Sequence, residues 1–135
     1  MAGDLPDYTT AVQVAVTVEG ELKYPEPASE RAAGKTGRYS GTAQTYQEVA
    51  SWTVAALKVG ELKEIIILSD DYAHTYCQVT VGSVVYATNW IVISAMPLIF
   101  EDLRLAAATV VKVECKSTDG TAIVVDAVIV GKEIG

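Results

Sequence analysis

The chain's only histidine, His74, lies in the segment SDDYAHTYC (residues 69–77), beside two aspartates and one of the two cysteines. Histidine, carboxylate and thiolate groups are the side chains used by zinc sites and by acid–base catalysis. In a turn followed by a strand, however, alternation places His74 and Cys77 on opposite faces of the sheet, so they cannot bind one ion. We interpret the segment as a structural turn, in which Asp70 and Asp71 bond to nearby backbone N–H groups. A weak cation site and a partner contact are the alternatives.

Other catalytic patterns are incomplete. The chain has no G-x-S-x-G motif in which the histidine could activate a serine. The segment GKTG (residues 34–37) has a Lys-Thr pair but lacks the earlier glycine and the preceding apolar strand of a P-loop. The carboxylate pairs in EPASE and ELKE have the residue type of a glycosidase, but such spacings are common on solvated surfaces. We therefore expect no enzyme, and no catalytic, cofactor-binding or metal-ligating residue.

The composition excludes further classes of function. The 135 residues are half hydrophobic, and 17 acidic against 10 basic residues give a net charge of −7. This charge disfavours binding to nucleic acid, because phosphate-binding surfaces carry clustered Lys and Arg. Residues 72–100 contain no charged side chain, but their polar residues recur too often for a lipid-facing helix. The N-terminal MAGDLPDYTT lacks the apolar core of a secretion signal. We expect a soluble chain with no membrane span.

The elements that would position any site follow a two-residue period. In the N-terminal region, Val12, Val14, Val16 and Val18 fall on one face of a predicted strand. Residues 25–44 are rich in Gly, Ala and charge without periodicity, so we interpret them as an extended loop. The sequence therefore predicts an N-terminal arm and extended loop over residues 1–45, and a β domain over residues 46–135.

Strand patterns follow in quick succession from residue 46. A helix over residues 48–58 is the alternative to the first strand, but Gly60 and the β-branched residues weaken it. Asp119-Gly120, between two alternating runs near the end of the chain, is typical of a β-hairpin. Eight or nine short strands predict an all-β sandwich or barrel. The predicted segments are 46–54, 62–68, 75–81, 83–88, 89–94, 98–108 (a strand or a short helix), 110–116 and 122–134.

The last predicted strand is apolar on both faces. One face carries Ile123, Val125, Ala127 and Ile129, and the other carries Ala122, Val124, Val128 and Val130. A two-sheet core needs only one of these faces, so the other is expected to be covered by the N-terminal region or by a neighbouring subunit. We therefore predict that the contacts with other subunits or with a shell involve Val12, Val14, Val16, Val124, Val128 and Val130.

Cysteine and tryptophan side chains are interpreted as core residues. Cys77 and Cys115 lie in alternating apolar patterns, which favours reduced buried thiols over a disulfide. Trp52 and Trp90, with the tyrosines, raise the alternative of a carbohydrate-binding module. Trp52, however, alternates with apolar neighbours as a core residue should, and Trp90 lies in an apolar run.

The segments SWTVAALKVGELKEIIILSDD and TVVKVECKSTDGTAIVVDAVIVGKEI, with the alternating run between them, resemble the small jelly-roll structural proteins of tailed bacteriophages, of the capsid decoration or cement type. The resemblance covers about residues 46–134 and lies in the layout of strands. It implies an antiparallel, jelly-roll-like β-sandwich of about eight strands, in a non-enzymatic virion protein assembled in the host cytoplasm. Such proteins form trimers or other oligomers and bind the major capsid protein through arms and loops. A tail or baseplate component and a carbohydrate-binding sandwich are the alternatives.

Overall fold

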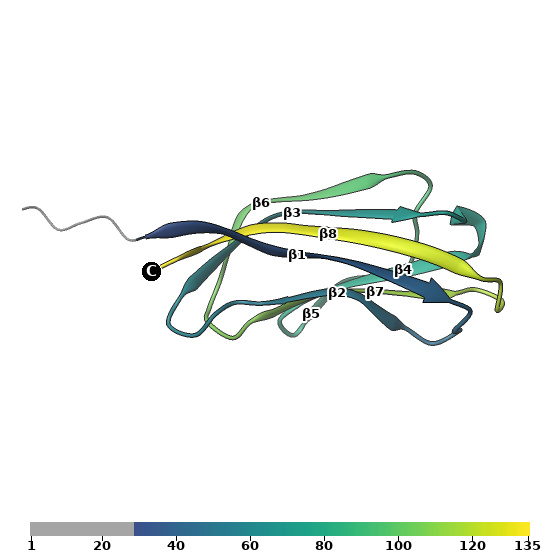
Figure 1. Ribbon diagram of the computed structural model, residues 1–135, viewed down its shortest axis with the longest axis horizontal. Coiled ribbons are helices and arrows are strands. Elements are labelled where there is room, and N and C mark those ends of the chain that lie inside the picture. The colour runs from purple at the N-terminus through teal and green to yellow at the C-terminus, as the bar shows by residue number, and fades with distance from the viewer. Residues whose placement is uncertain (1–28) are drawn as a thin grey trace, which may run out of the picture.

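The computed structural model describes residues 29–135, which form two four-stranded antiparallel sheets packed face to face (Figure 1). The first sheet has the strand order β1-β8-β3-β6 and the second has the order β2-β7-β4-β5. The prediction of an antiparallel β-sandwich with about eight strands is confirmed. The strands are β1 (Glu30–Gly41), β2 (Gln47–Thr53), β3 (Val59–Ser69), β4 (Thr75–Val81), β5 (Val84–Ile91), β6 (Met96–Leu105), β7 (Val110–Ser117) and β8 (Ile123–Ile134).

The strand pairs are nested within one another. β1 pairs with β8, β2 with β7, β3 with β6 and β4 with β5, all antiparallel. The chain therefore follows one long hairpin that is rolled into two layers, which is the arrangement of a jelly roll. The predicted strands at residues 83–88 and 89–94 form the single strand β5 up to Ile91. The ambiguous segment 98–108 is strand up to Leu105, as part of β6, which begins earlier, at Met96. The first predicted strand is β2, not a helix.

Alternate side chains of the strands fill the space between the sheets. In β4, β7 and β8 every second residue is buried, as a two-residue period requires. Cys77 on β4 lies directly opposite Cys115 on β7, and both are free thiols with no exposed surface, as predicted. The core also contains aliphatic side chains with no exposed surface: Leu62, Ile65, Ile67, Val79, Val111, Val113 and Val125.

The extended loop predicted over residues 25–44 is wrong for residues 30–41, because these form β1 and pair with β8 along its whole length. Two glycines interrupt the alternating pattern by which this strand would be predicted from the sequence. Gly34 has a φ of +122°, and a Cβ there would lie 2.1 Å from the carbonyl oxygen of Ile129. A Cβ on Gly37 would lie 1.9 Å from the carbonyl oxygen of Val49. The glycines allow close backbone approach and do not indicate a loop. Residues 1–28 of the predicted arm and loop, with Val12, Val14 and Val16, lie outside the described residues.

The hairpin predicted at Asp119-Gly120 is also wrong, although both flanking strands are present. β7 pairs with β2 and β4, whereas β8 pairs with β1 and β3 in the other sheet. Gly120 does have a positive φ, +90°, and Asp119 accepts a hydrogen bond from the Thr121 N–H at 3.0 Å. The prediction of a turn at Asp119-Gly120 is therefore confirmed, although the turn does not close a hairpin. A connection longer than the two residues of a tight hairpin can cross the roughly 10 Å between packed sheets.

Candidate functional site

The segment SDDYAHTYC joins β3 to β4 through the 3-10 helix η2 (Tyr72–His74). The Thr75 hydroxyl donates to the backbone oxygen of Asp71 at 2.6 Å and lies 2.8 Å from the Ser69 hydroxyl. Asp70 continues the ladder between β3 and β8, since its carboxylate accepts from the Val124 N–H at 2.8 Å while its own N–H donates to the Val124 oxygen. These bonds stabilise a turn, as the sequence predicts.

The one histidine has carboxylate partners and no cysteine partner. His74 Nδ1 lies 2.9 Å from Asp71 Oδ2, and its Nε2 lies 3.6 Å from Asp119 Oδ2. The hydrogen bond to Asp71 raises the pKa of His74, and the charge of Asp119 adds to this. Asp71 thus bonds a side chain, and not a backbone N–H as predicted. Cys77 faces the core, and residues 29–135 contain no group of three His, Cys, Asp or Glu side chains placed to hold a metal ion.

Two buried carboxylates lie at the end of the sandwich where β1 begins and β8 ends. Glu133 accepts from the Ala55 N–H at 2.9 Å and from Arg31 Nη2 at 2.9 Å, and these bonds lower its pKa. Glu61 lies 3.1 Å from Arg104 Nη2. Both carboxylates of ELKE lie on the outer face of the sheet, where Glu61 is buried in register with Lys132 and Glu64 is half-buried in register with Val130. Glu133 thus links β8 to β1, and Glu61 links β3 to β6.

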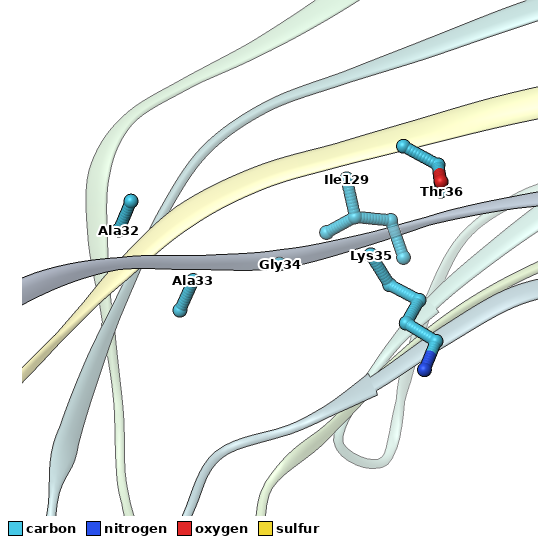
Figure 2. A pocket seen from close by; sticks show the side chains of 6 residues that line it. All are labelled: Ala32, Ala33, Gly34, Lys35, Thr36 and Ile129. Atoms are coloured by element: carbon cyan, nitrogen blue, oxygen red, sulfur yellow. The ribbon is translucent and has the colours of Figure 1, made fainter.

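A shallow, open hollow follows β1 on the surface (Figure 2). Gly34 leaves a gap in the row of side chains, and the Lys35 side chain extends away from the strand. The hollow contains no acid, histidine or cysteine, so it offers contact and not acid–base chemistry. Its lining residues are Ala32, Ala33, Gly34, Lys35, Thr36 and Ile129.

The outer face of the sheet β1-β8-β3-β6 is apolar in the middle. On β8, Val124, Val128 and Val130 point outward and are half-buried, whereas their neighbours Ile123, Val125 and Ile129 are buried. The sequence therefore assigned the two faces of this strand correctly. Neighbouring strands extend the apolar surface, with Ile66 and Pro97 in the row of Val128. Ile99 lies in the row of Val130, with Glu64 between them. We call this surface the valine face: Val124, Val128, Val130, Ile66, Leu68, Pro97 and Ile99.

The part of the valine face that lies outside β8 is not among the contacts predicted from the sequence. Leu68 is 44% exposed and Ile99 is 70% exposed. In the run LKEIIIL, Ile66 and Leu68 alternate with Ile65 and Ile67, so β3 has two apolar faces just as β8 does. That pattern could have identified β3 as the neighbour of β8. Ile99 could not have been found, because residues 98–108 were ambiguous between strand and helix.

Neither tryptophan is fully presented to solvent. Trp52 is 5% exposed in the core, as predicted, and Trp90 is half-buried and packs against the core. Both tryptophans are therefore used for packing, whereas Tyr86, one of the tyrosines, is 53% exposed. In the described part of the chain, no helix is long and apolar enough to cross a membrane.

Comparison with known proteins gives one weak structural similarity and no family. No protein-family model matches the chain, and no curated protein matches it in sequence. Among solved structures, the chain is similar to a chain of the cyanophage Pam1 capsid asymmetric unit, with 12% identity and a TM-score of 0.41. That match covers 87% of this chain and 95% of the other. The strand order, and not this neighbour, defines the fold as a jelly-roll sandwich with one apolar outer face.

Proposed function

We propose that the chain is a non-enzymatic structural protein of a bacteriophage virion, of the type that decorates and stabilises the capsid as an oligomer. The valine face carries this proposal, together with the resemblance of the strand layout to such proteins. The similarity to the cyanophage chain is too weak to support a function.

The valine face is apolar beyond what the core requires. A two-sheet sandwich buries one face of each sheet, and the inward residues of β3 and β8 already do this. Each outward Val, Ile or Leu left in water forgoes roughly 25 cal/mol for every Å² that a partner could cover. Contiguous apolar patches of this kind mark protein–protein contacts on soluble proteins. The face is therefore suited to a partner protein.

Charged pairs lie on either side of the centre of the valine face. Asp126, between Val124 and Val128 on β8, lies 2.6 Å from Arg38 on β1, and Lys132, beyond Val130, lies 2.6 Å from Glu30. The apolar centre is formed by Val128, Val130, Ile66 and Pro97, and an apolar centre flanked by charged residues is typical of a protein interface. This pattern supports docking on a folded partner, for which the major capsid protein is our proposal.

The test is binding to particles of the phage that encodes the chain, prepared without it. Purified chain should sediment with these particles in a saturable way and raise the temperature at which they release their genome. Val128→Lys should weaken binding at least tenfold, since it puts an unpaired charge in the apolar centre. Thr53→Lys, on an exposed position of β2, is the matched control and should bind normally. No sedimentation, or equal binding by Val128→Lys, would refute the proposal.

Each of the two alternatives predicts a different result. A tail or baseplate component would bind isolated tails and not heads. A carbohydrate-binding sandwich would be stabilised against heat by a sugar, because a ligand that binds only the folded state raises Tm.

The N-terminal arm, with Val12, Val14 and Val16, is proposed as a second contact to the shell or to a neighbouring subunit. Its deletion must stop before β1, so the variant to test lacks residues 1–28. Removing residues 1–44 would also remove β1, which pairs with β8 along its whole length. The shorter deletion should leave the sandwich folded and reduce particle binding or oligomer formation.

A further inference from the structure

β5 is an open edge of the second sheet. It pairs with β4 on one side, and no strand of the described residues pairs with its other side. The backbone N–H and C=O groups on that side are therefore free to bond another strand. The stretch without charged residues found in the sequence, residues 72–100, contains the whole of β5. Long edge strands without charge or proline are templates for pairing with another chain.

The other three edges within residues 29–135 are protected. The edge of β2 is covered by β1, whose Gly37 backbone lies against the Val49 carbonyl. The edge strand β1 carries four charged residues, and the edge strand β6 carries one proline and three charged residues. These are the devices by which proteins prevent edge-to-edge association. β5 has none of the charges and no proline, and its one device of this kind is a pair of register shifts against β4.

Apolar side chains accompany the open edge of β5. Val84, Val85, Tyr86 and Ile91 are each 50% to 55% exposed, and Ile93 just beyond the strand is 78% exposed. An edge strand that only terminated a sheet would gain nothing from these residues. Their burial against a partner adds hydrophobic stabilisation to the backbone hydrogen bonds.

We propose that β5 pairs antiparallel with β5 of a second copy of this chain, so that two four-stranded sheets become one continuous sheet of eight strands. The absence of charge in β5 fits this occupant. Two copies with a net charge of −7 repel each other over most of their surfaces, and β5 is a surface where they can meet without charge. In a two-fold pair each residue also lies near its own counterpart, so any charge in β5 would face itself.

Two bulges limit the residues that can pair. Asn89 has a φ of +52°, and its N–H donates to the Tyr46 hydroxyl at 2.6 Å. The register against β4 shifts near Asn89 and again between Val85 and Ala87, so Val84 and Val85 form the regular part that faces a partner. The contact is two-fold, so it gives a dimer or joins two larger oligomers. It cannot by itself close the trimer that the family resemblance implies.

The experiment uses opposite charges at one position of the full chain. Val85→Lys and Val85→Glu each bring two like charges together, within about the 10 Å over which charges interact at moderate salt. Leu57→Lys, at a turn residue that is 95% exposed, is the matched control. Association is measured by sedimentation velocity over a range of concentrations, and the Tm of each variant shows that it is folded.

We expect the wild-type chain and Leu57→Lys to associate equally, and each Val85 variant alone to associate at least tenfold more weakly. An equimolar mixture of Val85→Lys and Val85→Glu should recover wild-type association, because the two charges then attract. A monomeric wild-type chain, or undiminished association of Val85→Lys, would overturn the pairing. Failure of the mixture to recover would also overturn it, and would show that β5 contacts another segment, such as the N-terminal region. No particle is present, so these results are independent of capsid binding.

Discussion

The two long sides of the sandwich differ in how the sheets meet. On the side of β1 and β2, the backbone of Gly37 lies against the Val49 carbonyl, and the edges of the two sheets are in contact. On the side of β5 and β6, the approach is much looser, and Tyr86 and Phe100 meet edge to face with ring centroids 5.6 Å apart. We infer that the first side stabilises the fold, while the second is left open for a partner.

The closed side gives the largest predicted effect. Gly37→Val places a side chain where a Cβ alone would lie 1.9 Å from a backbone oxygen, so β1 must separate from β2. We expect the free energy of unfolding to fall by more than about 3 kcal/mol in denaturant titrations, as for a severe packing defect. Thr36→Val, at the exposed neighbouring position, should change it by less than about 0.5 kcal/mol. Equal stability of the two variants would mean that this side is not closed.

A second effect on the closed side comes from Glu133, which links β8 to Arg31 and to the Ala55 N–H. Glu133→Ala leaves that N–H without its acceptor and should cost about 1–3 kcal/mol of stability. The folded-state pKa of Glu133 is lowered, so its contribution is present above the ordinary value of 4.5 and is lost as the pH falls through the lowered value.

The matched variant for the pH effect is Glu133→Gln, which keeps a carbonyl acceptor and removes the charge. Its stability should fall less steeply than that of wild type between neutral pH and about pH 3 in urea titrations. Parallel pH profiles would show that the carboxylate does not contribute through its charge.

The two thiols can compare how readily each side opens. Cys77 lies on β4 next to β5, and Cys115 lies on β7 next to β2. Burial raises the pKa of both thiols to about 12, so both should react slowly in the native state and rapidly after denaturation. With single-cysteine variants, Cys77 should react faster than Cys115, because its side opens more easily. Equal rates would remove the difference between the sides, and no thiols without reductant would indicate a disulfide.

The smallest effect is expected at His74, which belongs to neither side. Its pKa is raised, so its small contribution to stability is present below pH 6.5 and is lost as the pH rises through the raised value. NMR titration should place its pKa above 6.5, and His74→Ala should leave assembly and metal content unchanged. A stoichiometric metal in the wild-type protein that disappears in this variant would contradict a structural role.

Local patterns in the sequence predicted the strands better than their partners. β4 coincides with the predicted segment 75–81, because its apolar and polar residues alternate without interruption. β1 was missed, since Gly34 and Gly37 serve backbone contacts with residues far away in the chain. The partner of a strand in a jelly roll is set by nested, long-range pairing, which no local turn signal specifies. Asp119-Gly120 shows this most clearly.

The candidate surfaces follow the same rule. The outward valines of β8 were predicted because one strand carries both apolar faces in its own sequence. The open edge of β5 was not predicted, although residues 72–100 were recognised as uncharged, because being an edge is a property of the whole sheet. The absence of charge in residues 72–100 indicates a candidate contact surface only when β5 is known to be an edge strand.

The most direct test of the proposed virion role is the protein composition of virus particles purified from the source of the chain, measured by quantitative mass spectrometry. The proposed role predicts that the chain is present at a fixed integer ratio to the major capsid protein, and that this ratio survives repeated purification. Absence of the chain from particles, or trace amounts that vary between preparations, would contradict a structural role in the virion.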